Sequence, residues 1–398
     1  MSQFILINRI KVQNANAIAG FTWGFPAITH FLGFTHNLAR KLAEEGRFND
    51  ILLTGCAVIS HEQYVHTYRS SYDYEFTQSR NPPYLASHNK ADTPPVIEEG
   101  KMNLTVSLLI GYQGNIGNRQ ENFISWLAKK CLLQRLAGGT ILNIKSIETH
   151  TPEKDNISRI KRKLLPGFVL KDRSNYLEKH YFSLQENNMG VELLDAWLDF
   201  ITLKQKSRPK CELINKHLKN NHKIHINDLQ YAELLEVWQT HLQQVPYQEA
   251  SIPNKLKNYF SELEEVGANE KLLKQWQNYC SPTQETQADW EYIRKPEAGF
   301  LVPIMTGYKA ISPVYNNTEV ESTRDNETDV CFVESAHSIG EWQSIHRLKT
   351  TEELNSCLWH YHYEENWYLC KHSTAQQQKE EDISNSKNIT ENPDDDFL

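Results

Sequence analysis

Residues 4–12 read FILINRIKV, a run in which large apolar side chains loosely alternate with polar ones. Such a run is typical of a β-strand. A helix is expected after the loop of residues 14–29, because Thr29 can act as its N-cap. The apolar side chains after this cap fall at helical spacing: Phe31, Phe34, Leu38 and Leu42. The chain is therefore predicted to begin with a strand followed by a helix.

Three more strands and a second helix continue this pattern. Residues 51–59 and 102–112 are rich in β-branched and other apolar side chains, and residues 119–136 carry apolar positions at helical spacing. Residues 139–145 give a fourth strand. The resulting order, β-α-β-β-α-β, is that of the ferredoxin-like fold, which RNA-recognition modules share. We therefore predict an α+β protein with a ferredoxin-like (RRM-like) core in residues 1–150.

Composition divides the rest of the chain into further parts. Residues 60–101 are polar, aromatic and proline-containing and are too numerous for a plain hairpin loop, which suggests an extended arm. Residues 374–398 hold two lysines and seven acidic residues with few apolar side chains, so this tail is expected to be disordered. Between them we predict a basic linker and helix (151–206), a helical insertion (207–295) and a β-rich C-terminal part (296–373).

Charge is unevenly distributed along the 398 residues, whose formal net charge is −8. The first 43 residues hold four basic residues and no acidic one. Residues 129–173 hold eleven basic and four acidic residues, and the densest run is RIKRK at 159–163. A local basic excess on an acidic chain is typical of a polyanion site, although a merely solvated basic face has the same composition.

The chain carries no signal for a membrane or for secretion. No stretch reaches the roughly 18–20 apolar residues that cross a bilayer. No basic residue precedes the short apolar run of residues 4–7, so a secretory signal is not expected. The seven cysteines are odd in number and far apart, which does not suggest a disulfide framework. We expect a cytoplasmic protein without a membrane partner.

Catalytic and metal-binding signatures are weak. The sequence has no GxSxG elbow, no phosphate-binding P-loop and no GxGxxG motif. The two histidines of His61–His66 are one residue too far apart for a zinc-protease helix. A second cluster lacks the paired ligands of structural zinc sites, and its aromatic neighbours favour a buried strand pair: Cys357, His360, His362, Cys370 and His372. We therefore expect no catalytic residue, no metal and no cofactor.

RNA binding, if present, is expected at loops and edges, because the third strand lacks the aromatic side chains of the standard RNA-recognition signature. The acid-free loop after the first strand offers Asn14, Asn16 and Trp23, while Arg135 and the run 159–163 offer positive charge. Amides can read base edges, aromatic rings can stack on bases, and Arg and Lys neutralise phosphates. Trp23 is equally compatible with simple packing of the loop on the core.

Several motifs resemble a known family. The matching blocks are RIKVQNANA (9–17), TWGFP (22–26), VIEEG (96–100), RLAGG (135–139), RKLLPGF (162–168), GFLVPI (299–304), RDNET (324–328), GEW (340–342) and LWHYH (358–362). Together they resemble the second Csy subunit, a Cas5-like member of the RAMP proteins, of type I-F CRISPR surveillance complexes. Residues 185–290 look longer than the family core requires, and the acidic tail after residue 373 has no counterpart in the pattern.

This resemblance implies a non-catalytic subunit that binds the 5′ handle of CRISPR RNA for antiviral defence against foreign DNA. Its implied partners are the large (Cas8-like) subunit, the first backbone (Cas7-like) subunit and possibly target DNA, and residues 60–101 would form a thumb-like arm. Transferred by motif, the implied RNA contacts are Arg9, Asn14, Asn16, Trp23, Arg135, Arg162 and Arg324.

Two alternatives stay open. The chain could be an endoribonuclease that processes CRISPR repeat RNA, since Cas5-like proteins of another subtype cut RNA. The base would then be one of several histidines, with Lys161 or Arg162 stabilising the phosphorane: His30, His36, His61 or His66. It could also be a helical adaptor built around residues 174–290 without any RNA role.

Overall fold

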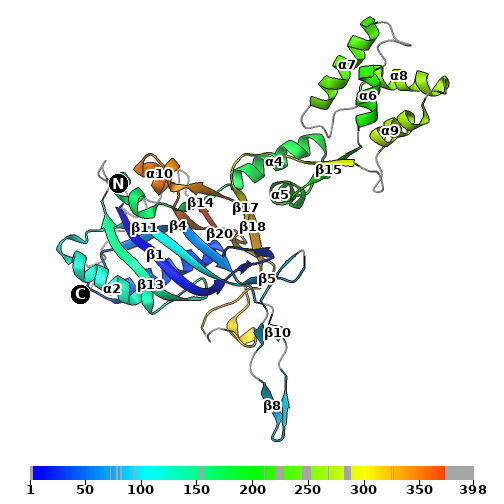
Figure 1. Ribbon diagram of the computed structural model, residues 1–398. Helices are drawn as coiled ribbons and strands as arrows, with labels where there is room; N and C mark the ends of the chain where they lie inside the picture. Colours follow the sequence, from blue (N-terminus) through cyan, green and yellow to red (C-terminus); the bar gives the residue numbers. More distant parts are fainter. Residues whose placement is uncertain are drawn as a thin grey trace. The chain divides into compact units, whose positions relative to one another are not determined.

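A ten-stranded antiparallel sheet forms the centre of the structure, a computed structural model (Figure 1). The structure describes residues 3–71, 73–77, 79–80, 83–93, 96–97, 99–151, 156–209, 211–220, 228–243, 252–267, 269–281, 288–323, 325 and 327–372. The chain forms two compact units, one of residues 1–200 with 297–398 and the other of residues 201–296. The predicted α+β class is confirmed: the chain combines helices with a large antiparallel sheet.

The sheet belongs to the first unit. Its strands lie in the order β12 (Arg135–Leu136), β13 (Gly139–His150), β1 (Gln3–Asn16), β11 (Lys101–Gln113), β4 (Leu52–Val65), β14 (Phe168–Asp172), β18 (Val333–Ser344), β17 (Leu301–Ala310), β20 (Trp367–His372) and β19 (Trp359–Glu364). Trp359 of β19 also pairs with Cys56 of β4. The end of the sheet formed by β19 therefore curls back onto β4.

Two helices cover one face of the first four long strands. Along the chain, β1, α1 (Ile28–Glu44), β4, β11, α2 (Gln120–Leu132) and β13 follow one another in the predicted order, with short strands between them. Apolar side chains of both helices and of these strands form one continuous core. The predicted N-cap at Thr29 is wrong. The N-cap is Ala27, so the helix begins two residues earlier than predicted, and Ala27 and Ile28 are both buried.

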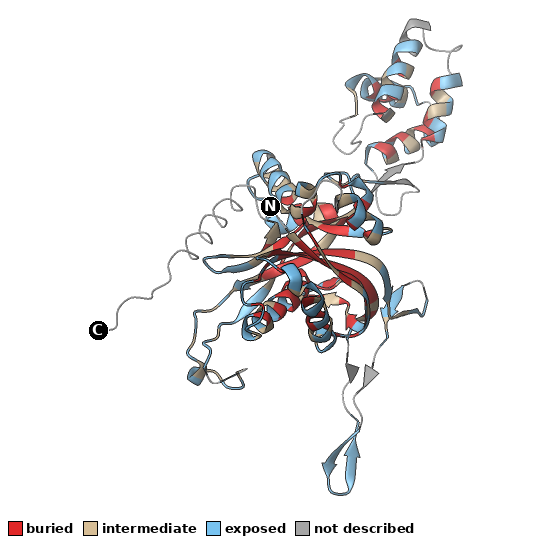
Figure 2. Ribbon diagram, turned by 90° about the vertical axis from the view of Figure 1, so that its left-hand side faces the viewer, coloured by how far each residue is buried: buried red, intermediate tan, exposed pale blue. Residues whose placement is uncertain are grey.

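The opposite face of these strands is only partly covered. At one end, α3 (Asn156–Leu164), η3 (Ile345–Arg347) and α10 (Thr351–Asn355) pack on a second apolar cluster, which includes Phe4, Leu6 and Ile160. Figure 2 shows how far the strands are buried compared with the exposed hairpins. Beyond α3 the sheet face is open, and the candidate site lies there.

The segment expected to be a basic linker takes part in the sheet. Residues 168–172 form β14, which lies between β4 and β18. In place of the single helix expected within residues 151–206, the structure has α4 (Ser174–Asn187) and α5 (Leu193–Ile201) after β14. Trp197 of α5 donates a hydrogen bond to the Ser338 carbonyl of β18. This segment therefore belongs to the same compact unit as the first 150 residues.

The expected arm starts later than residue 60, because β4 continues to Val65. Beyond it the described residues form short paired strands: β5 (Thr67–Arg69) with β6 (Tyr74–Phe76), β7 (Ser79–Arg80) with β10 (Val96–Ile97), and β8 (Tyr84–Ser87) with β9 (Lys90–Asp92). Figure 1 shows them as a ribbon that extends from the sheet. A further small hairpin, β2 (Ile18–Ala19) with β3 (Thr22–Trp23), follows β1.

The second unit is mainly helical. It contains β15 (Gln205–Pro209), α6 (Glu212–Asn220), α7 (Asp228–Gln243), α8 (Asn254–Glu265), α9 (Glu270–Cys280) and β16 (Ala288–Tyr292). Its helices share a separate core around Trp238, Phe260 and Trp276. None of the helices in the described residues is long and apolar enough to span a membrane. The acidic tail of residues 374–398 lies outside the described residues.

Candidate nucleic-acid interface

Two bulges in β1 decide which of its side chains reach the open face. Ile5 and Ile7 face the helices, so strict alternation would send Lys11 there as well. The pairing with β11 instead shifts register between Ile7 and Ile10, where Arg9 adopts a φ of +48°. This extra residue moves Ile10 and Val12 into the core and leaves Lys11 exposed. A second register shift follows at Asn14, whose φ is +54°.

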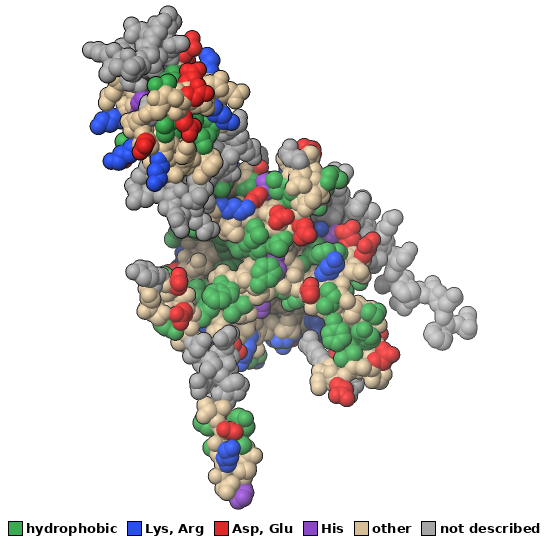
Figure 3. Space-filling model, turned by 90° about the vertical axis from the view of Figure 1, so that its right-hand side faces the viewer, with side chains coloured by type: hydrophobic (Ala, Val, Ile, Leu, Met, Phe, Trp, Pro, Cys, Tyr) green, Lys and Arg blue, Asp and Glu red, His purple; other side chains and the backbone are tan. Residues whose placement is uncertain are grey.

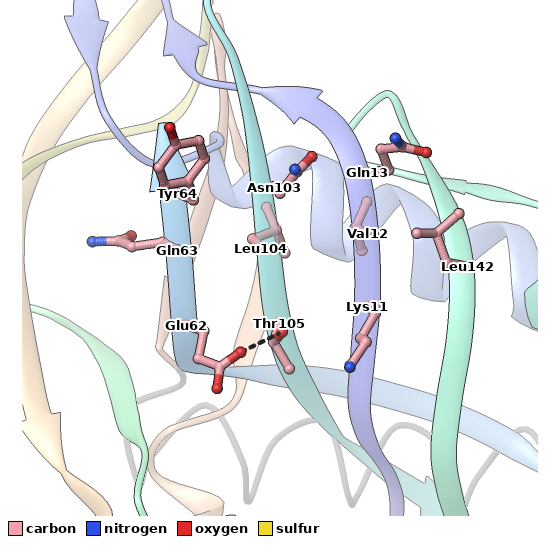
Figure 4. A pocket seen from close by; sticks show the side chains of 10 residues that line it. All are labelled: Lys11, Val12, Gln13, Glu62, Gln63, Tyr64, Asn103, Leu104, Thr105 and Leu142. Atoms are coloured by element: carbon pink, nitrogen blue, oxygen red, sulfur yellow. Dashed lines mark hydrogen bonds between the residues drawn. The ribbon is translucent and has the colours of Figure 1, made fainter. Parts of the chain in front are cut away.

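Polar side chains form rows across the open face. Lys11 of β1 lies beside Thr105 of β11, and Thr105 lies beside Glu62 of β4, whose carboxylate accepts a hydrogen bond of 3.3 Å from the threonine hydroxyl (Figure 4). In the next row Asn103 pairs with the exposed Tyr64. The backbone N–H of Asn14 donates to the Asn103 side chain at 3.1 Å. Amide, hydroxyl, aromatic and ammonium groups therefore point out of one surface.

These rows border a shallow hollow of about 300 Å³. Its lining residues are Lys11, Val12, Gln13, Glu62, Gln63, Tyr64, Asn103, Leu104, Thr105 and Leu142. Glu62 is the acidic residue among them, and it is exposed at the β4 side of the hollow. A hollow with this lining is suited to one nucleotide of single-stranded RNA. A base can stack on an aromatic ring such as that of Tyr64, and an ammonium group such as that of Lys11 can neutralise a phosphate.

A hydrogen-bonded network supports the edge of this face nearest α3. His61 Nδ1 lies 2.7 Å from the Pro166 carbonyl oxygen, and its Nε2 lies 2.7 Å from the Ser107 hydroxyl. Burial lowers the pKa of His61, which favours the neutral ring. Because a carbonyl can only accept, the neutral ring donates from Nδ1 and has an acceptor nitrogen at Nε2, where the single Ser107 hydroxyl proton is shared with Asn8 Oδ1 at 3.1 Å. Both ring nitrogens of His61 are thus occupied within the protein.

Arg9 joins the same network. Its backbone N–H donates to the Ser107 hydroxyl oxygen at 2.9 Å, and its Nη2 donates to the Leu165 carbonyl at 3.1 Å. The predicted RNA contact at Arg9 is therefore half-buried and tied to the turn that follows α3. A guanidinium has five N–H donors, so this single side-chain contact leaves capacity for a phosphate.

The basic run 159–163 divides between two tasks. It forms the last turns of α3, and Ile160 is buried beneath it. Lys161 donates to the carbonyls of His346 and Leu348 at 3.0 and 2.5 Å, and Lys163 forms an ion pair with Glu148. Arg162 is exposed, with its Nε 3.4 Å from the Ser158 carbonyl of its own helix. Of this run, Arg159 and Arg162 have their charges directed to solvent, Arg159 lying 4.0 Å from Glu148, while both lysines hold the fold together.

The three predicted residues after the first bulge differ in their surroundings. Asn14 is exposed beside the open face. Asn16 is half-buried, and its side-chain oxygen accepts from the Ile18 N–H at 3.2 Å, so it shapes the turn into β2. Trp23 is 65% exposed, and its ring lies 4.6 Å from the Phe76 ring of the arm. The expectation that Trp23 could pack the loop on the core is wrong, because most of its surface faces solvent.

Arg135 lies in a different hollow, of about 350 Å³, on the α1 side of β12. The residues lining this hollow include no acidic side chain: His30, Gly33, Phe34, Asn37, Lys41, Leu133, Gln134, Arg135, Ala137 and Gly138. Asn37 donates to the Gln134 side chain at 2.6 Å. Arg135 and Lys41 supply two cations beside amide groups. The two hollows share no lining residue, so the structure does not gather all predicted contacts in one place.

The sequence missed several members of both hollows, and Arg324 lies outside the described residues. The missed residues are Lys11, Lys41, Tyr64, Asn103 and Thr105. Lys11 and Thr105 each stand between apolar residues in a strand. Which face of the sheet they occupy depends on where the bulges of β1 lie, and the sequence pattern does not show this. The sequence shows Asn103 as a polar residue within a β-rich run, but it does not show which face of the sheet the Asn103 side chain occupies.

The Cys and His residues near the C-terminus belong to the β19–β20 hairpin and the turn before it. Cys357 and Cys370 are buried, and the ring of His372 lies 4.5 Å from that of Trp359. His362 instead contacts Glu364 at 3.1 Å. Among the residues that the structure describes, no group of three or more His, Cys, Asp or Glu side chains is arranged to hold a metal ion.

Two comparisons with known proteins agree with each other. The chain matches the family model described as CRISPR-associated protein (Cas_Csy2) over residues 5–226 and 249–370. It is 29% identical over 388 residues to the CRISPR-associated protein Csy2 of Pseudomonas aeruginosa (strain UCBPP-PA14), covering 93% of this chain and 94% of that relative. The family match includes residues 185–226 and 249–290 of the segment expected to exceed the family pattern, and residues 227–248 between them lie outside the match.

Proposed function

The chain belongs to the Csy2 family of CRISPR-associated proteins, and we propose that it is a non-catalytic subunit that binds the 5′ handle of CRISPR RNA. In this proposal it pairs with the large (Cas8-like) subunit of a type I-F surveillance complex and lies next to the first backbone (Cas7-like) subunit. Sequence reading of foreign DNA then falls to base pairing by the guide, and the protein needs only to hold the handle.

The observation that carries the proposal is the open face beside the two bulges of β1. It offers Lys11 for a phosphate, Asn103 for a base edge and Tyr64 for stacking, all within one hollow. Outside the hollow, the exposed Trp23 of β3 and the exposed Arg162 of α3 offer the same stacking and charge. We place one part of the handle here and another part at Lys41 and Arg135, where no acidic residue lines the hollow.

The arrangement of the first strands suits this role. β13, β1, β11 and β4 are neighbours in that order, all antiparallel, and the two connecting helices cover one face. We assign these elements to a ferredoxin-like module, whose second face is the usual platform for RNA. The short paired strands of residues 67–97 would serve as the thumb-like arm against a neighbouring subunit.

The hydrogen bonds of His61 and Lys161 support a non-catalytic role. A general base needs a free nitrogen within reach of the attacking hydroxyl. Both nitrogens of His61 are engaged, with Pro166 and Ser107. The Lys161 ammonium, considered above as a stabiliser of the phosphorane, donates to two backbone carbonyls instead. These groups hold the turn of residues 165–167 and α3, and Ser107 is fully buried, so its contact with His61 does not face a substrate.

The test compares two RNAs of equal length, one with the repeat-derived 5′ handle and one with the handle scrambled, by fluorescence anisotropy with the purified chain. We expect tighter binding of the handle RNA and no cleavage of repeat RNA without metal over several hours. Equal affinity for both RNAs contradicts handle recognition. Specific cleavage that is lost in His61→Ala or His66→Ala contradicts the non-catalytic assignment.

A further inference from the structure

An apolar patch lies at the other end of the sheet, away from the β1 bulges in strand order. It is centred on Ile311, Phe332 and Trp367, and we name it the Trp367 patch. Phe332 is 57% exposed and Ile311 is equally so, while Trp367 is 37% exposed. Figure 3 shows hydrophobic side chains interspersed with acidic ones on the face that it presents.

Strand pairing places these side chains on one surface. Lys309 of β17 is opposite Trp367 of β20 and also opposite Glu334 of β18, and Glu364 of β19 is opposite Trp367. Residues directly opposite in an antiparallel pair point to the same face. Ile311 and Phe332 continue this face two residues beyond Lys309 and Glu334, and the Ile311 N–H donates to the Phe332 carbonyl at 3.0 Å.

The patch is held by local structure. Tyr315 pairs with Val330, and its ring lies 6.0 Å from that of Phe332. The Phe332 N–H donates to the Ser312 hydroxyl at 2.9 Å, and the Lys309 ammonium lies 4.9 Å from the centre of the Trp367 ring. These bonds fix large apolar side chains in exposed positions, where they contribute little to the core. Ordered, exposed aromatic side chains of this kind mark an interaction site.

Acidic residues surround the patch. Residues 311–334 contain six acidic residues and one basic residue. The exposed Glu334 and Glu364 flank Lys309 and Trp367 in the same cross-strand row. An anionic rim repels phosphates, which separates this surface from the two hollows that offer Lys11, Lys41 and Arg135. RNA is thus disfavoured as the occupant, although aromatic rings alone would accept it.

We infer that the Trp367 patch is a docking surface for another protein, whose contact surface has an apolar centre and a rim of Lys or Arg. Charge complementarity selects this occupant: opposite potentials across an interface favour the right partner and speed its association. Trp is among the residues that most often dominate interface energy, and Phe is enriched at the centres of interfaces. The inference goes beyond handle binding and requires only that the chain is part of a multi-subunit complex.

The test is site-specific photo-crosslinking within the whole complex. Phe332 is replaced by p-benzoyl-L-phenylalanine, and the chain is co-expressed with the other protein subunits of its CRISPR complex and a guide RNA. Phe182 on α4, which is 55% exposed, receives the same replacement as the matched control. We expect position 332 to crosslink to a different protein subunit, at a segment that mass spectrometry shows to be rich in Lys or Arg. A crosslink to RNA, a crosslink to a second copy of this chain, or a yield no higher than at position 182 overturns the inference.

Charge reversal gives an independent measure. Phe332→Lys and Glu334→Lys should each lower the amount of the crosslinked subunit in the purified complex at least tenfold, compared with Phe182→Lys. The affinity of the purified variants for handle RNA should stay within twofold of the unmodified chain. Retention of the subunit in both variants contradicts the docking surface. If the unmodified chain binds handle RNA no more tightly than scrambled RNA, the proposed function is contradicted, and the crosslinking result still supports the docking surface.

Discussion

Removing three cations should change both the strength and the salt dependence of handle binding. The triple variant Lys11→Ala, Arg135→Ala, Arg162→Ala removes one cation from each predicted contact region. Lys11 and Arg135 line the two hollows, and Arg162 is exposed on α3. Arg9 is left in place, because its Nη2 hydrogen bond to Leu165 gives it a structural role.

The expected magnitude follows from counterion release. Each phosphate contact to single-stranded RNA steepens the plot of log affinity against log salt by about 0.7, so the variant should be shallower by about 2. If the electrostatic contribution vanishes near about 1 M salt, each contact is worth about 0.6 of a decade at about 0.15 M. The three together then amount to about 50-fold, or about 2.4 kcal/mol.

Fluorescence anisotropy at several salt concentrations measures both quantities. The matched control removes the same total charge from exposed residues outside both hollows, as Lys129→Ala, Lys179→Ala, Lys349→Ala. We expect the control to change affinity less than threefold and to keep the slope. An equal loss in both variants would show that only the overall field matters. A triple variant with unchanged slope would show that none of these three side chains meets a phosphate.

Three further outcomes are expected. Trp23→Ala should weaken handle binding by roughly 5- to 150-fold, the equivalent of about 1–3 kcal/mol for one stacked base, at unchanged salt slope; affinity within twofold of the unmodified chain contradicts stacking by Trp23. Burial lowers the pKa of His372 to about 3, so the unfolded chain binds a proton at this residue at a higher pH than the folded chain does. The free energy of unfolding should therefore decrease as the pH falls below about 6.5, by about 2 kcal/mol at about pH 5. Urea unfolding at both pH values should show a smaller loss for His372→Asn, and an equal loss contradicts the assignment. Gly307→Ala should destabilise the chain by about 3 kcal/mol or more, because the new Cβ would lie 2.0 Å from the Tyr368 carbonyl oxygen. The control Gly33→Ala places its Cβ where no atom lies within 4 Å, and it should be neutral or slightly stabilising in the same unfolding assay.

Hydrophobic periodicity was enough to predict the order of the main strands and helices in the first 150 residues. It could not predict which face Lys11 occupies. That depends on bulges at Arg9 and Asn14, which adopt positive φ values although neither is glycine. Glycine is the usual mark of such a conformation and asparagine the next most tolerant residue, so the sequence carried a weak signal at Asn14 and none at Arg9. A single extra residue exchanges the two faces of a strand, and here it decides which side chains reach the hollow.

The basic run at 159–163 shows a second limit of composition. Consecutive residues of a helix point in different directions, about 100° apart. The five residues therefore cannot all share one surface: Ile160 enters the core, Lys161 bonds to backbone carbonyls, and Arg159 and Arg162 face solvent. A count of positive charges treats them alike. The helical assignment of α3, which was not predicted, was needed to separate the binding candidate from the structural residues.

The distribution of charge also constrains how the chain can assemble. With a net charge of −8, the chain as a whole repels RNA, but at about 0.15 M salt such repulsion decays within about 8 Å. RNA near the open face therefore responds to Lys11 and its neighbours and hardly at all to the acidic residues around Trp367. The Trp367 patch, by the same screening, attracts a basic protein surface only at close range. In the proposed assembly the two surfaces use different strands and opposite charges, so we expect the RNA and the protein partner to bind in either order.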